Sequence, residues 1–175
     1  MMIDSIFCLQ FDPTEMSALA GRYKDEKENG AFEAGSQIRA GAYTRAHLGT
    51  IFEWKTNGRG KSRLLENTDD EIADALNLAV TAKTERAALA VLCGLHGVDV
   101  PVASAILTAI YPERYTVIDF RALEALGIKK TNLTVNFYLD YLADCRKRAK
   151  AQTIELRELD RALWQWSKEA KDQTT

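Results

Sequence analysis

Residues 92–126 read LCGLHGVDVPVASAILTAIYPERYTVIDFRALEAL, and this stretch decides the fold. Gly97 permits a sharp turn, because a residue without a β-carbon is not strained at positive φ. Pro101 suits the first turn of a new helix, where a missing N–H costs nothing. Asp119 can cap a third helix that ends at Gly127. The stretch therefore predicts a helix, a tight hairpin, a second helix, a connector and a third helix.

Apolar residues recur at helical spacing along most of the remaining chain, and almost no stretch alternates with the period of a strand. We predict an all-α fold: a compact single domain over residues 1–175, with about seven helices and a hairpin core at residues 85–126. The region 24–35 is charged and carries two glycines, which favours a loop. Outside the hairpin core, helices are expected over residues 13–26, 36–54, 69–82, 133–149 and 154–171. The expected helix starts are Asp12 as a cap before Pro13, a capping box of Thr68 and Glu71, and Thr84 as the cap of the helix that leads to the hairpin.

The composition bounds the class of protein. A chain of 175 residues with 46% hydrophobic content suits one globular domain with a substantial core. The sequence has no signal peptide and no apolar run of about 18 residues, so we expect a soluble, cytoplasmic protein that does not span a membrane. The net charge of −2 excludes a strongly basic nucleic-acid binder, so any contact with DNA requires a local patch.

The cysteines and histidines give no metal motif. The three cysteines, Cys8, Cys93 and Cys145, lie far apart without a CxxC pair, which argues against a zinc site or a disulfide framework. His47 and His96 have no carboxylate at metal-ligand spacing. We therefore expect no bound metal.

Residues 95–103, LHGVDVPVA, resemble the helix–hairpin–helix element of the HhH-GPD DNA glycosylases, the endonuclease-III-like and alkyladenine-glycosylase-like enzymes. In that family a Leu-Pro-Gly-Val-Gly hairpin and the start of the next helix grip a DNA phosphate, and an essential Asp follows one helix later. Residues 117–121, VIDFR, stand where the Asp segment should be. The similarity is clear over residues 85–126 and weaker elsewhere, and it implies a DNA-glycosylase-like fold.

The resemblance implies that Asp119 is the catalytic carboxylate. Cleavage of an N-glycosidic bond builds positive charge on the deoxyribose, and a fixed carboxylate can stabilise that charge or orient an attacking water. The alternative is that Asp119 only caps the helix that follows it. The two roles are compatible.

Pro101 is the sharpest departure from the family. Bifunctional members carry a lysine at the aligned position, and 119 − 101 = 18 residues is the separation that the family pattern leads us to expect. Proline has no amine for a Schiff base, so the implied enzyme is monofunctional, with water as nucleophile and no AP-lyase activity. Lys83, Lys129 or Lys130 would replace that lysine only if the alignment were wrong. The four-cysteine iron–sulfur loop of many relatives is also missing, so no cofactor is expected.

Two segments are candidates for contact with double-stranded DNA. Backbone groups of Gly97, Val98 and Val100, with the start of the following helix, form a natural phosphate site. Asp99 replaces the second glycine of the family and either turns back onto the hairpin backbone or repels a phosphate. A plain turn between helices is the alternative to a phosphate site.

The second segment is residues 55–63, KTNGRGKSR, which hold four cations, two glycines and no anion. Such a composition suits phosphates, and the alternative is a flexible solvated loop. The cations are Lys55, Arg59, Lys61 and Arg63.

Two functions follow from the resemblance. The first is a monofunctional DNA N-glycosylase that flips a damaged or modified base out of the duplex and removes it with the help of Asp119. The second is a catalytically inactive protein with the glycosylase fold that binds DNA or a protein partner. Asp99, the missing lysine and the acidic charge balance favour the second function.

Overall fold

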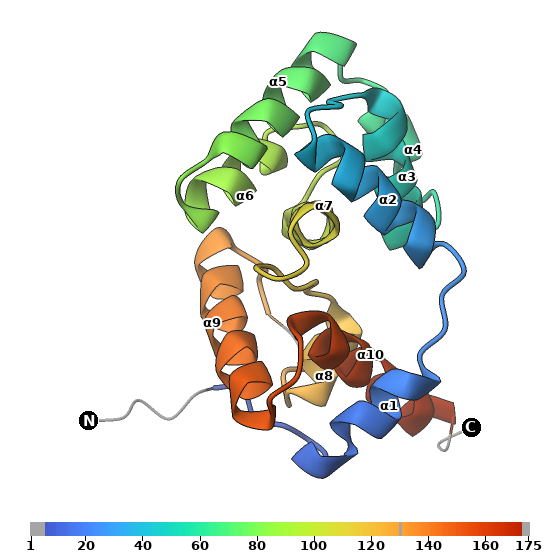
Figure 1. Ribbon diagram of the computed structural model, residues 1–175, viewed down its shortest axis with the longest axis vertical. Helices are drawn as coiled ribbons and strands as arrows, with labels where there is room; N and C mark the ends of the chain where they lie inside the picture. Colours follow the sequence, from blue (N-terminus) through green and yellow to red (C-terminus); the bar gives the residue numbers. More distant parts are fainter. Residues whose placement is uncertain (1–5, 130, 173–175) are drawn as a thin grey trace. The chain divides into compact units, whose positions relative to one another are not determined.

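The computed structural model describes residues 6–129 and 131–172, and all regular structure in these residues is helical (Figure 1). The all-α prediction is confirmed, although the described residues form ten α-helices rather than about seven. In chain order the elements are η1 (Pro13–Glu15, a 3-10 helix), α1 (Met16–Arg22), α2 (Glu28–Arg39), α3 (Arg45–Thr56), α4 (Lys61–Leu64), α5 (Asp69–Thr81), α6 (Glu85–Cys93), α7 (Val100–Ile110), α8 (Phe120–Ala125), α9 (Val135–Gln152) and α10 (Leu156–Asp172).

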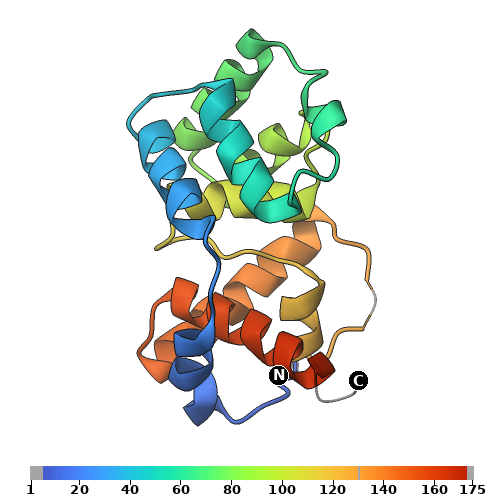
Figure 2. The ribbon, with the colours of Figure 1, turned by 90° about the vertical axis from the view of Figure 1, so that its right-hand side faces the viewer.

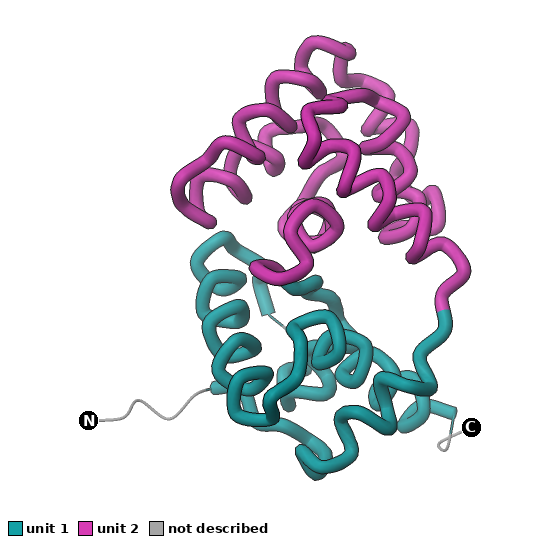
Figure 3. The backbone as a smooth tube through the Cα atoms, viewed as in Figure 1, with its two compact units in different colours: residues 1–24, 116–175 teal, residues 25–115 magenta. Residues whose placement is uncertain are grey.

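The helices group into two compact units, which Figure 3 colours separately. Unit 1 comprises residues 1–24 and 116–175, and unit 2 comprises residues 25–115. The hairpin therefore belongs to unit 2, whereas Asp119 belongs to unit 1. The organisation of residues 1–175 as one domain stays a prediction.

Unit 2 is built around α7, which is seen almost along its axis in Figure 1, with α2, α3 and α6 packed against it. Every residue of α7 except Pro101 is buried, as expected of a helix that is apolar on all sides. The crossing of α2 and α7 is close, because a β-carbon on Gly35 would lie 2.0 Å from the carbonyl oxygen of Ala109.

Unit 1 is organised by α10, whose apolar face packs against α1, α8 and α9 (Figures 1 and 2). Two buried tyrosines on α9 hold the segment that leads into α8. The hydroxyl of Tyr138 donates to the carbonyl oxygen of Thr116 at 2.9 Å, and that of Tyr141 donates to the carbonyl oxygen of Val117 at 2.8 Å. These bonds satisfy buried polar groups and fix the chain just before Asp119.

Predicted caps are confirmed where the signal is local. The Asp12 carboxylate accepts the N–H of Thr14 and caps η1, with Pro13 at its first position. Thr68 and Glu71 form a capping box at the start of α5, and Thr84 caps α6. Side chains of this kind satisfy the unpaired N–H groups of a first turn.

Three predicted segments are wrong. The expected loop at residues 24–35 is mostly α2, because Ala31, Ala34 and Gly35 lie on one buried face together with Glu28. The expected helix at residues 36–54 is divided, since Gly41 has φ +103° and Thr44 starts a new helix as its cap. The first helical segment ends at Arg22 rather than near residue 26.

Candidate nucleic-acid interface

The turn between α6 and α7 is formed by residues 94–99. Gly97 has φ +80°, the conformation that the sequence predicts there. The N–H of Val98 donates to the carbonyl oxygen of Leu95 at 3.2 Å and closes the turn. Val98 and Val100 are buried, and the N–H of Val98 is used within the turn.

Asn67 ties this turn to the end of α4. Its side chain is 3% exposed, and its Oδ1 accepts the N–H of His96 at 2.9 Å. Its Nδ2 donates to the carbonyl oxygens of His96 and Leu64 at 3.0 and 2.9 Å. The approach is so close that a β-carbon on Gly97 would lie 2.9 Å from the backbone nitrogen of Leu64. The turn and α4 are therefore held as one piece.

A cavity of about 570 Å³ lies between the turn and the segment that connects α3 to α4, entirely within unit 2. It brings together four residues predicted to contact DNA: Arg59, Arg63, Gly97 and Val98. The side chains of both arginines are exposed. The full lining is Phe52, Thr56, Arg59, Gly60, Arg63, Cys93, Gly94, Leu95, His96, Gly97, Val98, Asp99 and Val102.

The other two predicted cations do not line this cavity. Lys55 is half-buried near the end of α3, and Lys61 opens α4 and lines a different cavity. The prediction of a loop over residues 55–63 is also wrong in part. α3 continues to Thr56, and only Asn57–Gly60 separates it from α4, with φ of 51° at Asn57 and 80° at Gly60.

Asp99 lines the same cavity as the arginines. Its Oδ1 accepts the N–H of Val102 at 3.0 Å and caps α7. The carboxylate therefore occupies the N-terminus of α7, the position to which the helix dipole would otherwise attract an anionic ligand. His96 is exposed, with Nδ1 3.5 Å from Oε2 of Glu66. The cavity therefore carries two arginines and one carboxylate, and His96 gains charge only when protonated.

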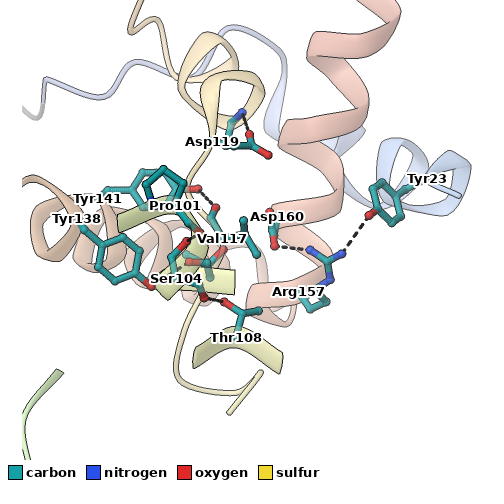
Figure 4. A network of polar contacts seen from close by, with 12 residues as sticks. Tyr23, Pro101, Ser104, Thr108, Val117, Asp119, Tyr138, Tyr141, Arg157 and Asp160 are labelled. Carbon is teal, nitrogen blue, oxygen red and sulfur yellow. Dashed lines mark hydrogen bonds and ion pairs between the residues drawn. The ribbon is translucent and has the colours of Figure 1, made fainter. Parts of the chain in front are cut away.

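Asp119 is the half-buried N-cap of α8 in unit 1, and its Oδ1 accepts the N–H of Ala122 at 2.9 Å (Figure 4). The residues before it, Val117 and Ile118, are buried. Burial raises the pKa of the Tyr141 hydroxyl well above its usual range, so the group stays protonated and donates to Val117. The predicted cap is confirmed, and its carboxylate is held on a fixed backbone.

Pro101 occupies the first turn of α7, as the sequence predicts. Lys83 and Lys129 are exposed, and Lys130 lies outside the described residues.

Within residues 6–129 and 131–172, no group of three or more His, Cys, Asp or Glu side chains is arranged to hold a metal ion. In the same residues, no helix combines the length and apolarity needed to cross a membrane.

Sequence reasoning missed Asn67 and the role of α4. Asn67 stands beside the capping box that begins at Thr68, and nothing local distinguishes it from an ordinary loop asparagine. Its partners Leu64 and His96 become neighbours only through tertiary structure. The property that distinguishes Asn67 is its burial, and a polar stretch of sequence does not reveal which of its residues is buried.

Comparison with protein-family models finds no match, and neither the curated proteins nor the solved structures give one. The resemblance over residues 85–126 therefore remains an interpretation of the sequence.

Proposed function

We propose that the protein is a monofunctional DNA N-glycosylase that binds duplex DNA through the cavity between the Gly97 turn and the α3–α4 segment. The observation that carries the proposal is the lining of this cavity, in which Arg59 and Arg63 face the same space as the turn. Arginine side chains are among the usual contacts of a DNA phosphate. Asn67 supports this role, because it holds the turn and α4 at a fixed separation.

Asp119 supplies the carboxylate for the reaction. The C1′–N bond breaks and its electron pair leaves with the base, while the carboxylate stabilises the positive charge on the sugar. Water then adds to C1′ and its proton passes to the departed base, giving a neutral free base and an abasic site. A carboxylate offers about four acceptor positions, so capping α8 through one oxygen is compatible with this role.

The second candidate function is a protein that binds DNA or a protein partner without excising a base. Asp99 favours it, because a carboxylate in the cavity opposes the approach of a phosphate. Binding without catalysis would leave Asp119 with its capping role alone.

A screen of duplexes with different lesions tests the proposal. Alkali-labile sites are measured after incubation with wild type, Asp119→Asn and, as a matched control, Asp12→Asn. Asparagine caps a helix nearly as well as aspartate, so both variants keep the fold while losing one charge. We expect excision by wild type and Asp12→Asn, and a loss of about a hundredfold or more in Asp119→Asn.

Three outcomes decide between the candidates. Equal excision by wild type and Asp119→Asn would remove Asp119 from the mechanism. Strand cleavage by wild type without alkali would contradict a monofunctional enzyme. Duplex binding without excision on any substrate would support the second candidate.

A further inference from the structure

An exposed aromatic side chain stands at the start of α8 in unit 1. Phe120 is 57% exposed, whereas most large apolar side chains of the described residues are buried. It is the first residue of α8 and follows Asp119 directly in the chain. Single exposed apolar side chains are common on protein surfaces, so the exposure of Phe120 gains meaning only from the groups around it.

Two cations lie against the ring of Phe120. Nζ of Lys171 is 4.7 Å and Cζ of Arg121 is 5.2 Å from the centroid of this ring. A second ring, that of the half-buried Trp164, has Cζ of Arg121 at 5.0 Å and Nζ of Lys168 at 5.3 Å from its centroid. These two aromatic and three cationic side chains form one surface, which we call the α8–α10 surface.

The packing of α8 against α10 holds this surface in place (Figure 1). Trp164, Lys168 and Lys171 follow one another at intervals of four and three residues, so they lie on one face of α10. Glu124 of α8 binds α10 at this point. Its Oε2 accepts the hydroxyl of Ser167 at 2.6 Å, and its Oε1 lies 3.2 Å from Nζ of Lys171. The rings and cations are therefore carried by two helices that are joined to each other.

Two of the three cations have no carboxylate partner. Glu124 pairs with Lys171. Arg121 and Lys168 form no ion pair with any residue of the ranges 6–129 and 131–172, and both contact aromatic rings instead. Asp172 lies one helical turn beyond Lys168 without pairing with it. A ring attracts a cation but does not cancel its charge, so positive charge remains available beside the exposed ring.

We propose that the α8–α10 surface binds an unpaired stretch of DNA, with a base stacked on Phe120 and neighbouring phosphates at Arg121 and Lys168. Aromatic rings accept any base by stacking, and cations beside them meet the phosphates of the strand. An acidic peptide would use the cations but would leave the exposed ring without a specific partner. The inference rests on the proposed function, because Asp119 would act on a nucleotide turned out of the duplex and Phe120 adjoins Asp119 in the chain.

The test compares two labelled strands of equal length, an oligothymidylate and a strand of abasic nucleotides. Both carry the same phosphates, but only the first has bases that can stack. Fluorescence anisotropy measures both affinities for wild type, Phe120→Leu, Phe120→Trp and Lys168→Gln. The matched controls are Leu78→Ala, which removes a 47% exposed apolar side chain from α5, and Lys147→Gln, which removes an exposed cation from α9. Circular dichroism checks the fold of each variant.

We expect wild type to bind the thymidylate strand more tightly than the abasic strand. Phe120→Leu should weaken binding of the thymidylate strand by about fivefold or more and leave the abasic strand unchanged, whereas Phe120→Trp should keep the preference. Lys168→Gln should weaken both strands and reduce the slope of log K against log salt concentration by about 0.7 in magnitude. The two control variants should bind both strands as wild type does.

Equal affinity of wild type for the two strands, or the same preference in wild type and Phe120→Leu, would overturn the proposal. Polyglutamate that displaces the labelled thymidylate strand as well as unlabelled thymidylate does would also overturn it, in favour of an acidic peptide. Failure of base excision, with the preference lost in Phe120→Leu, would reject the glycosylase and leave this surface standing. Base excision without that loss would reject the surface alone.

Discussion

Gly35 on α2 lies so close to Ala109 on α7 that a β-carbon would be 2.0 Å from the carbonyl oxygen of Ala109 and 2.8 Å from the backbone nitrogen of Ile110. Both contacts are with main-chain atoms of a buried helix, so no side chain can rotate away. The two helices can meet at this distance only if the residue on α2 has no side chain. The packing of unit 2 therefore depends on this glycine.

Gly35→Ala should destabilise the protein by more than about 3 kcal/mol, because α2 must move away from α7 and leave a packing defect. Gly30→Ala is the control on the same helix, where a β-carbon meets only a methyl group at 3.8 Å. It should leave stability unchanged or raise it by up to about 1 kcal/mol. Urea unfolding followed by far-ultraviolet circular dichroism measures both changes. Equal stability of the two variants would show that the crossing is not rigid.

The same glycine explains why the sequence predicts only part of the fold. Caps at Thr68, Thr84 and Asp119 were predictable, because each depends on residues three positions apart. Gly35 indicates a loop when its neighbours alone are considered, yet it lies within a helix because a distant helix requires it there. Short helices such as α4 are missed for a different reason, because four residues are too few to show a helical period.

The candidate site was predictable to a similar degree. The turn at Gly97 and the cations at Arg59 and Arg63 have local signals, namely a glycine before a helix start and a run of positive charge. No local signal in the sequence shows that Arg63 and Lys61 line different cavities. These residues are two positions apart on α4 and point to different surroundings, which only the packed helix reveals.

Asn67→Ala should loosen the Gly97 turn, because it removes one acceptor and two donated hydrogen bonds at a buried position. We expect a loss of about 2–4 kcal/mol in the free energy of unfolding, together with weaker DNA binding. Asn77→Ala, at an exposed position on α5, should change stability by less than about 0.5 kcal/mol. Thermal or urea unfolding and fluorescence anisotropy with a labelled duplex measure the two effects. An unchanged DNA affinity in a destabilised Asn67→Ala protein would separate the turn from binding.

Arg59→Glu and Arg63→Glu should each weaken duplex binding and lower the dependence of log K on log salt concentration by about one unit per lost phosphate contact. Lys61→Glu should have a smaller effect, since Lys61 lines the other cavity. Lys147→Glu, an exposed change of the same type on α9, is the control for net charge. Anisotropy titrations at several salt concentrations give the slopes. If the slope of log K against log salt concentration is the same in all four variants as in wild type, this cavity is excluded as the DNA contact.

The pair of Arg22 and Glu169 should make unit 1 sensitive to acid. Arg22 contacts both carboxylate oxygens at 2.7 and 2.9 Å and, with the hydrogen bond donated by the amide of Gln165, it lowers the pKa of Glu169 from 4.5 to about 2. A lowered pKa in the folded state stabilises the protein above pH 4.5, and this contribution is lost as the pH falls toward 2. Glu169→Gln should therefore cost up to about 1 kcal/mol at pH 7 and nothing near pH 2. Urea unfolding across this range measures the difference, and in an Arg22→Gln background the pH-dependent effect of Glu169→Gln should become smaller, because Arg22 is the largest cause of the lowered pKa.

The three cysteines should alkylate in a fixed order. Cys8 is exposed and should react first with iodoacetamide, whereas burial, with the nearby charge of Asp99, raises the pKa of the Cys93 thiol to about 11. Because the thiolate is the reactive form, Cys93 should react slowly at pH 8 and faster as the pH approaches 11. Cys145 is buried and its pKa is also raised, so it should react only after unfolding. Mass spectrometry of labelled peptides gives the rates, and in concentrated urea the three should become equal. Labelling of Cys93 as fast as Cys8 at pH 8 would contradict the burial of this wall of the cavity.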